Sequence, residues 1–230
     1  MRRIALITAG GAGLRMGADK PKQFLTLAGK SLLCHAILAF HQAFDNMEFV
    51  VVLPADQGFR KDLLLQECGH ALAIHFVEGG ATRFHSVQNG LRAIGAQLKD
   101  QADEAIVFVH DGVRCLVSPS LIQRCSQQAL EKGSAIPVLP ATESVRLQTA
   151  HGHHPFDRNQ VMLVQTPQTF HSSILLPAFE QEYQEGFTDE ATVVEASGQL
   201  VFLVAGDFNN IKITRPIDLE LAAVLLRNRD

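Results

Sequence analysis

The chain has 230 residues and a formal net charge of −4 at pH 7, with 47% hydrophobic and 19% charged residues. This length predicts a single domain over residues 1–230, and the charge argues against a broad cationic surface for nucleic acid, so any anion site must be built locally. No apolar run approaches the roughly 20 residues of a membrane helix, and residues 4–9 are too short for a signal peptide. We therefore expect a cytoplasmic protein with neither a membrane nor a nucleic acid among its partners.

Short apolar runs alternate along the chain with amphipathic segments of helix length. Strands are expected at residues 3–8, 49–53, 72–77, 105–110, 135–139 and 200–204, and helices at 31–44, 86–98 and 118–132. The last of these helices opens on Ser118-Pro119, a good N-cap followed by a good first helical residue. Strands that are apolar on both faces and followed by helices predict a Rossmann-like, three-layer α/β domain with a mostly parallel sheet.

One region, at about residues 141–165, breaks this alternation. Two strand-like runs at 143–147 and 160–164 are separated by a stretch that contains AHGHHPFDRN, with glycine and proline, and they predict a protruding two-stranded β-arm. Such an arm cannot bury both of its faces alone, so we expect it to pack against a partner.

Histidine and cysteine give little sign of a metal site. His151, His153 and His154 lie in the arm, where a close cluster in a turn is more often solvated than metal-bound. The four cysteines contain no CxxC pair and are most simply buried thiols.

The strongest chemical signal is TAGGAGLRMGADKPKQFL, residues 8–25. It is not a P-loop, because Ala18 follows Gly17, and its GxGxxxG spacing is one residue too long for a dinucleotide fingerprint. A tight turn would explain the glycines but not the two cations that follow them. Bare backbone amides with two nearby cations suit a triphosphate. The candidate residues are Ala9, Gly10, Gly11, Gly13, Arg15 and Lys22.

This loop and four later segments carry a family resemblance. The loop and EGGATRFHSVQNGL, VHDGVRCLVS, DRNQVMLVQTPQTF with TDEA, and NNIKITRPIDL, in this order, resemble the nucleotidyltransferase family that contains 2-C-methyl-D-erythritol 4-phosphate cytidylyltransferase. The match runs from Ile4 to about Leu221. It implies transfer of CMP from CTP to a polyol phosphate, with release of pyrophosphate, in the non-mevalonate isoprenoid pathway.

The resemblance also implies residue roles. Arg15, Lys22 and Lys212 would act on the phosphates as catalytic residues, while Gly80, Ala81 and Ser86 would read cytosine. Ser86 could equally be a helix cap, as could Thr82. Asp111 would bind Mg²⁺ or ribose, although a turn-stabilising aspartate is the plainer alternative. The residues implied for the polyol phosphate are Arg114, Ser144, Arg158, Thr166 and Thr188. In the family the arm donates the arginine at Arg158 to the neighbour's site, so the resemblance also implies a homodimer with two shared sites.

Two positions depart from the family pattern. Ala81 stands where the family usually has an acid, which bears on cytosine selectivity only if that side chain takes part. Asn209 replaces an acid that often lies three residues before the lysine, and Asp207 is the nearest carboxylate that could substitute for it near a metal.

Other functions remain open at this level. A cytidylyltransferase for another polyol phosphate, such as ribitol 5-phosphate, would share the glycine loop. A nicotinamide-dependent oxidoreductase lacks its ribose-binding acid here. A nucleotide-sensing module would not need cations placed for a leaving group.

Overall fold

The computed structural model describes residues 1–10, 21–69, 72–98 and 104–228. Its main sheet contains β1 (Arg2–Thr8), β4 (Met47–Leu53), β5 (Ile74–Glu78), β6 (Ala105–Asp111), β7 (Ser134–Pro140), β10 (Met162–Val164), β11 (Gln168–His171) and β12 (Leu203–Ala205). The helices are α1 (Leu32–Ala43), α2 (Lys61–Cys68), α3 (Arg83–Gln97), α4 (Pro119–Lys132), α5 (Ser172–Ala178), α6 (Glu190–Ala196) and α7 (Pro216–Arg227). Two small hairpins, β2 (Thr26–Leu27) with β3 (Lys30–Ser31) and β8 (Val145–Thr149) with β9 (Gly152–Phe156), complete the described elements.

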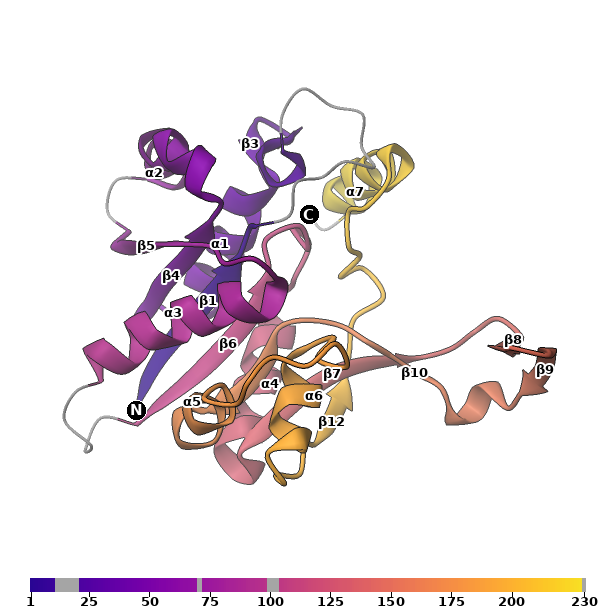
Figure 1. Ribbon diagram of the computed structural model, residues 1–230. Helices are drawn as coiled ribbons and strands as arrows, with labels where there is room; N and C mark the ends of the chain where they lie inside the picture. Colours follow the sequence, from indigo (N-terminus) through magenta and orange to yellow (C-terminus); the bar gives the residue numbers. More distant parts are fainter. Residues whose placement is uncertain (11–20, 70–71, 99–103, 229–230) are drawn as a thin grey trace.

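The main sheet has the strand order β10-β7-β11-β6-β1-β4-β5, with β12 also paired to β7 (Figure 1). Strands β6, β1, β4 and β5 are parallel neighbours, and β11 is antiparallel to both β6 and β7. The expected α/β class with a mostly parallel sheet is therefore confirmed. Several elements went unpredicted, namely the hairpin β2–β3, helices α2, α5, α6 and α7, and strand β11.

Helices cover both faces of this sheet, as the side chains of β1 show, because they point alternately to one face and the other. Ala5 and Ile7 pack with α1, α2 and α4 in one apolar cluster, whereas Ile4 and Leu6 pack with α3, α5 and α6 in another. Each strand thus buries both sets of side chains, which is why its sequence is apolar throughout. No helix within the described residues is both long and apolar enough to cross a bilayer.

Capping explains where two helices begin. Ser118 accepts a hydrogen bond from the amide of Leu121, and Pro119 is the first residue of α4, as predicted. Helix α3 begins at Arg83, three residues before the predicted start, because the Thr82 side chain accepts from the amide of His85. The early start brings Arg83 into the ordered first turn.

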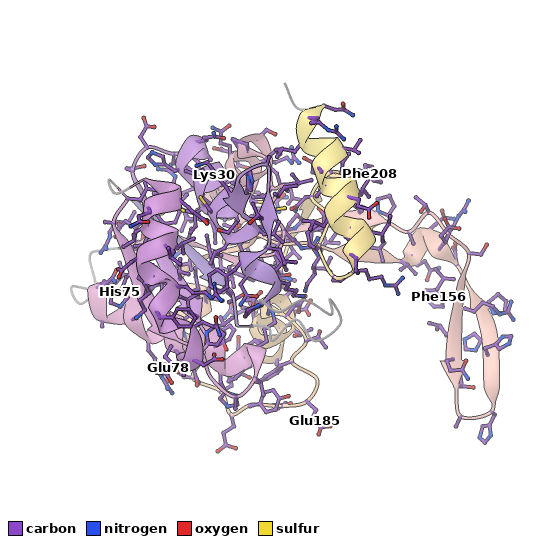
Figure 2. The ribbon with its side chains drawn as sticks, turned by 90° about the horizontal axis from the view of Figure 1, so that it is seen from above. Lys30, His75, Glu78, Phe156, Glu185 and Phe208 are labelled. Carbon is purple, nitrogen blue, oxygen red and sulfur yellow. The ribbon has the colours of Figure 1, made fainter. Side chains whose placement is uncertain are left out.

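The protruding arm exists as a hairpin, but its predicted pairing is wrong. Strand β8 pairs with β9 at residues 152–156, inside the stretch expected to separate two arm strands. Gly152, at φ +124°, permits the tight turn that closes this hairpin. The apolar run Met162–Val164 instead pairs antiparallel with β7 as part of the main sheet. Figure 2 shows the hairpin standing away from the rest of the chain, with Phe156 on it.

Candidate active site

A crevice lies where β1 and β6 end and where the chain turns after β5, at the carboxyl ends of the parallel strands, where open α/β sheets bind their ligands. It has a volume of about 270 Å³. Its lining comprises Thr8, Ala9, Gly10, Lys22, Gln23, Gly80, Ala81, Thr82, Arg83, Ser86, Asp111, Val113 and Lys212. The crevice therefore brings together every predicted catalytic and nucleotide-binding residue that lies within the described residues.

The start of the glycine loop is held from both sides. The amide of Ala9 donates to the carbonyl of Val52 at 2.9 Å, and its carbonyl accepts from Gln23 Nε2 at 2.6 Å. Gln23 is buried in the 3₁₀ turn Lys22–Phe24, so this contact fixes Lys22 beside the loop. Gln23 was not among the predicted site residues, although it lies within the segment 8–25.

Arg15, Gly11 and Gly13 lie outside the described residues. Their predicted phosphate contacts stay predictions.

The backbone of the turn after β5 is held close to α3 at Gly80, where no side chain fits. Gly80 donates its amide hydrogen to Ser86 Oγ at 3.1 Å, and that hydroxyl donates to the carbonyl of Thr82 at 3.0 Å. A Cβ on Gly80 would lie 2.4 Å from His85 Cβ, so a side chain does not fit there without movement. Of the two helix-cap alternatives, the one for Thr82 is confirmed, whereas Ser86 lies inside α3 and instead hydrogen-bonds the turn that precedes the helix. Ala81, between Gly80 and Thr82 in the sequence, also lines the crevice.

Asp111, the last residue of β6, is surrounded by three cations. Lys212 Nζ lies 2.9 Å and Arg114 Nε 3.6 Å from Asp111 Oδ2, and Arg83 Nη2 lies 3.5 Å from Asp111 Oδ1. The four residues come from three segments of the chain, since Asp111 and Arg114 lie only three residues apart. Burial by itself would favour a neutral carboxyl, but Arg83, Lys212 and Arg114 outweigh burial and hold the pKa of Asp111 far below its usual range. The carboxylate is therefore ionised at neutral pH.

Arg114 and Lys212 join the end of β6 to the segment before α7. Arg114 Nη1 donates to the carbonyl of Asn210 at 2.8 Å, two residues before Lys212. The Lys212 side chain is 42% exposed although its amine pairs with Asp111, so it can reach a ligand in the crevice. Lys212 thus lines the same crevice as Lys22, although the two lysines lie far apart in the sequence.

Arg83 makes a second ion pair, with Glu190. Its Nη1 donates to Glu190 Oε1, and its Nη2 donates to Glu190 Oε2 at 3.0 Å. Burial lowers the pKa of Arg83, but Glu190 and Asp111 more than reverse this and raise it, so the guanidinium stays charged. Glu190 was not identified as a candidate, because only the fold shows that this carboxylate is fully buried.

His110 supports Asp111 from behind, inside the core. Its Nε2 donates to the carbonyl of Arg114 at 3.1 Å, which leaves Nδ1 to accept from the Thr166 hydroxyl at 3.0 Å. Thr166 Oγ1 in turn accepts from the amide of Asp111 at 3.0 Å. Burial lowers the pKa of His110 to about 4, so the ring is neutral at pH 7. Thr166 is buried and here positions Asp111 through its amide.

The other residues implied for the polyol phosphate lie apart from the crevice lining of this chain. Ser144, Arg158 and Thr188 are exposed. Arg158 Nη1 donates to the carbonyl of Thr142 at 2.7 Å, at the base of the arm. Within one chain the fold does not bring Ser144 and Arg158 to Asp111.

Asp207 is engaged elsewhere. Its Oδ2 accepts from Ser118 Oγ at 3.1 Å and its Oδ1 from the amide of Asn209 at 2.9 Å, outside the crevice lining. In the part of the chain that is described, no three histidine, cysteine, aspartate or glutamate side chains come together as a metal site. Asp111 is accordingly the one carboxylate in the described lining.

Comparison with known proteins gives one consistent result. Residues 3–228 match the family of 2-C-methyl-D-erythritol 4-phosphate cytidylyltransferase. Proteins of that name from Bacteroides fragilis and Phocaeicola vulgatus are 45% and 46% identical to this chain, covering 98% of it and all of their own lengths.

Solved structures agree. A crystal structure of a 4-diphosphocytidyl-2C-methyl-D-erythritol synthase superposes with a TM-score of 0.80 at 27% identity, covering 98% of both chains. The 2-C-methyl-D-erythritol 4-phosphate cytidylyltransferase of Thermus thermophilus superposes with a TM-score of 0.73 at 32% identity, covering 96% of this chain and 98% of its own.

Proposed function

This chain belongs to the 2-C-methyl-D-erythritol 4-phosphate cytidylyltransferase family, and from that premise we propose how its crevice performs the reaction. It is an enzyme that transfers CMP from CTP to 2-C-methyl-D-erythritol 4-phosphate, yielding 4-diphosphocytidyl-2-C-methyl-D-erythritol and pyrophosphate in isoprenoid biosynthesis. The ribitol 5-phosphate alternative is not favoured, since relatives at 45% and 46% identity carry the methylerythritol name. The observation that carries the proposed mechanism is the convergence of Lys22, Lys212 and Asp111 on one crevice.

The chemistry asks mainly for positioning and for positive charge. An oxygen of the polyol phosphate monoester bonds to the α-phosphorus of CTP, and the bond from this phosphorus to the bridging oxygen breaks. Pyrophosphate leaves with the electron pair. The attacking oxygen is already anionic at neutral pH, so no general base is required. Lys22 and Lys212 face the crevice from two walls, where they would stabilise charge on the α-phosphate and on pyrophosphate.

The nucleotide base would lie against the turn after β5. Main-chain groups of Gly80 and Ala81 line the crevice there, and Ser86 keeps the turn in shape. Backbone carbonyls can accept from the exocyclic amine of cytosine, which uracil lacks, and a site that leaves such groups unpaired rejects the wrong base. Ala81 would contribute through its backbone, so loss of an acidic side chain there need not remove the preference.

Mg²⁺ fits the donor set as an ion brought by the triphosphate. Asp111 offers one ionised carboxylate, and Mg²⁺ commonly uses one or two carboxylates together with substrate phosphates. Bound there, it would neutralise phosphate charge. Lys212 occupies Asp111 Oδ2 in the free chain and would turn toward the phosphates.

We further propose a homodimer in which the arm completes the partner's site. The hairpin and the adjacent β10 leave Leu147, Phe156, Met162 and Leu163 exposed, which is unusual for an element that stands alone. Arg158 lies at the base of this arm, away from its own crevice. Mixing Arg158→Ala and Lys22→Ala chains should restore activity, since each hybrid dimer regains one intact site. No recovery despite confirmed subunit exchange would contradict arm sharing.

A cytoplasmic location is proposed as well. All four cysteines are free and buried, which suits a reducing compartment.

The test of function is pyrophosphate release, measured with each of four nucleoside triphosphates and a panel of polyol phosphates. CTP with 2-C-methyl-D-erythritol 4-phosphate should give the highest kcat/KM. Lys22→Ala should lower kcat by about 10²–10³-fold with a smaller change in CTP affinity. Lys61→Ala, at an exposed position on α2, is the matched control and should leave both unchanged. Equal turnover by Lys22→Ala would remove Lys22 from the chemistry.

A further inference from the structure

Arg83 contacts both Asp111, at the end of β6, and Glu190, at the start of α6. It follows the turn 80–82 directly and lines the crevice. Its Nη1 and Nη2 donate to the two carboxylate oxygens of Glu190, and the same Nη2 lies 3.5 Å from Asp111 Oδ1 on the nucleotide side. A planar fork can hold two partners in this way, whereas a lysine ammonium acts as a single point charge.

Glu190 directly follows the loop that carries Thr188, the residue that the family resemblance implies for the polyol phosphate. It is the first residue of α6, and Thr188 lies two residues before it. Asp189 caps the helix and also accepts from Gln168 Nε2 at 2.8 Å, while the amide of Ala191 donates to Gln168 Oε1 at 2.8 Å. These hydrogen bonds fix the start of α6 in position, and the hydrogen bonds between Glu190 and Arg83 hold the Arg83 side chain relative to it.

Phe84, next to Arg83, packs against the same loop. Its ring stacks on Phe179 at a centroid distance of 5.0 Å and on Phe187 at 5.5 Å, residues that lie at the two ends of the loop between α5 and α6. These apolar contacts already hold the loop on α3. A fully buried carboxylate is not needed for that, because well-packed apolar groups stabilise such a contact at least as well as a buried ion pair.

We propose that Arg83 and Glu190 are a positioning pair that sets the loop carrying Thr188 relative to Asp111, and so couples polyol-phosphate binding to the nucleotide site. The inference rests on the proposed function and adds two positioning residues to it. With the pair intact, Asp111 and Thr188 have one relative placement. Without it, Arg83 pairs with Asp111 alone, and the loop is held by its apolar contacts only.

Two conservative variants and two matched controls test the pair. Glu190→Gln keeps the shape and removes the charge, and Arg83→Lys keeps the charge and removes the fork. Glu195→Gln is the exposed control on the same helix α6, and Arg92→Lys is the exposed control on α3. The measurements are kcat, the KM for each substrate, and the Kd for CTP by calorimetry.

Glu190→Gln should raise the KM for 2-C-methyl-D-erythritol 4-phosphate about tenfold and lower kcat, with the Kd for CTP changed less than about threefold. Arg83→Lys should change both substrates, because Arg83 also contacts Asp111. The double variant should be no worse than the poorer single variant, since the two residues act as one unit. Both controls should match the wild type.

Three outcomes would overturn the inference. Wild-type kinetics in a folded Glu190→Gln enzyme would show that the pair positions nothing. A lower kcat with both KM values unchanged, in step with a lower melting temperature, would show a purely structural role. An inactive wild type in the same assay would overturn the proposed function and the coupling with it. The other two outcomes concern the variants only, so a failure of the proposed function can be told apart from a failure of the positioning pair.

Discussion

Acid should destabilise this fold through His110, which is fully buried beneath Asp111. The perturbation is a fall in pH from about 7 to about 4.5, applied to the wild type and to His110→Asn. The asparagine amide is polar and can accept from the Thr166 hydroxyl in place of Nδ1, but it is too short to reach the Arg114 carbonyl as Nε2 does, so the comparison uses the change in stability with pH rather than the stability itself. Unlike histidine, asparagine does not titrate.

The sign and size follow from the pKa of His110. Burial lowers this pKa to about 4, below the ordinary 6.5, so the unfolded chain binds the proton more readily than the folded one. The resulting stabilisation is complete above pH 6.5 and is lost as the pH falls toward 4. Each pKa unit corresponds to about 1.4 kcal/mol. Protonation of this one group therefore lowers the free energy of unfolding by roughly 3 kcal/mol between about pH 6.5 and about pH 4.

Urea unfolding in a buffer with a metal chelator measures the effect. Between about pH 7 and about pH 4.5, the wild type should lose roughly 2–3 kcal/mol more free energy of unfolding than His110→Asn. His75→Asn, an exposed histidine on β5, is the matched control and should follow the wild type. An equal loss in the wild type and His110→Asn would refute the reasoning, because the buried ring would then contribute nothing to acid sensitivity.

Three further predictions concern stability at neutral pH. Asp111→Asn should lower the free energy of unfolding by about 3 kcal/mol, because its cations lose their counter-charge, and inorganic pyrophosphate should raise the variant's melting temperature more than the wild type's. Gly80→Ala should cost about 1–3 kcal/mol in urea unfolding, because the new Cβ would lie 2.4 Å from His85 Cβ. Phe40→Ala should cost about 3–5 kcal/mol in the same assay, since this fully buried ring packs edge-on against Phe108 at 5.7 Å.

Each of these has a contrary result. If pyrophosphate raised the melting temperature of Asp111→Asn no more than that of the wild type, the cations around Asp111 would not form an anion site. Unchanged stability of Gly80→Ala would show that the first turn of α3 moves aside freely. A loss below about 1 kcal/mol for Phe40→Ala would mean that the core collapses around the cavity.

The arm shows where reading the sequence was insufficient. Both 152–156 and 160–164 can form strands, and local pattern does not say which one pairs with β8. The turn at Gly152 and the free edge of β7 decide it, because pairing depends on backbone hydrogen bonds to a distant strand.

Sequence by itself determined the layered α/β plan and the positions of the loops that carry chemistry. Both follow from local signals, since strands buried on two faces are apolar throughout and ligand loops follow their carboxyl ends. Only the tertiary structure decided that Arg83, Arg114 and Lys212 meet at Asp111, and that Glu190 is buried against Arg83. Except for Arg114, which lies three residues from Asp111, these side chains come from segments far apart in the chain, and the distances that govern their charges exist only after the sheet has set its register.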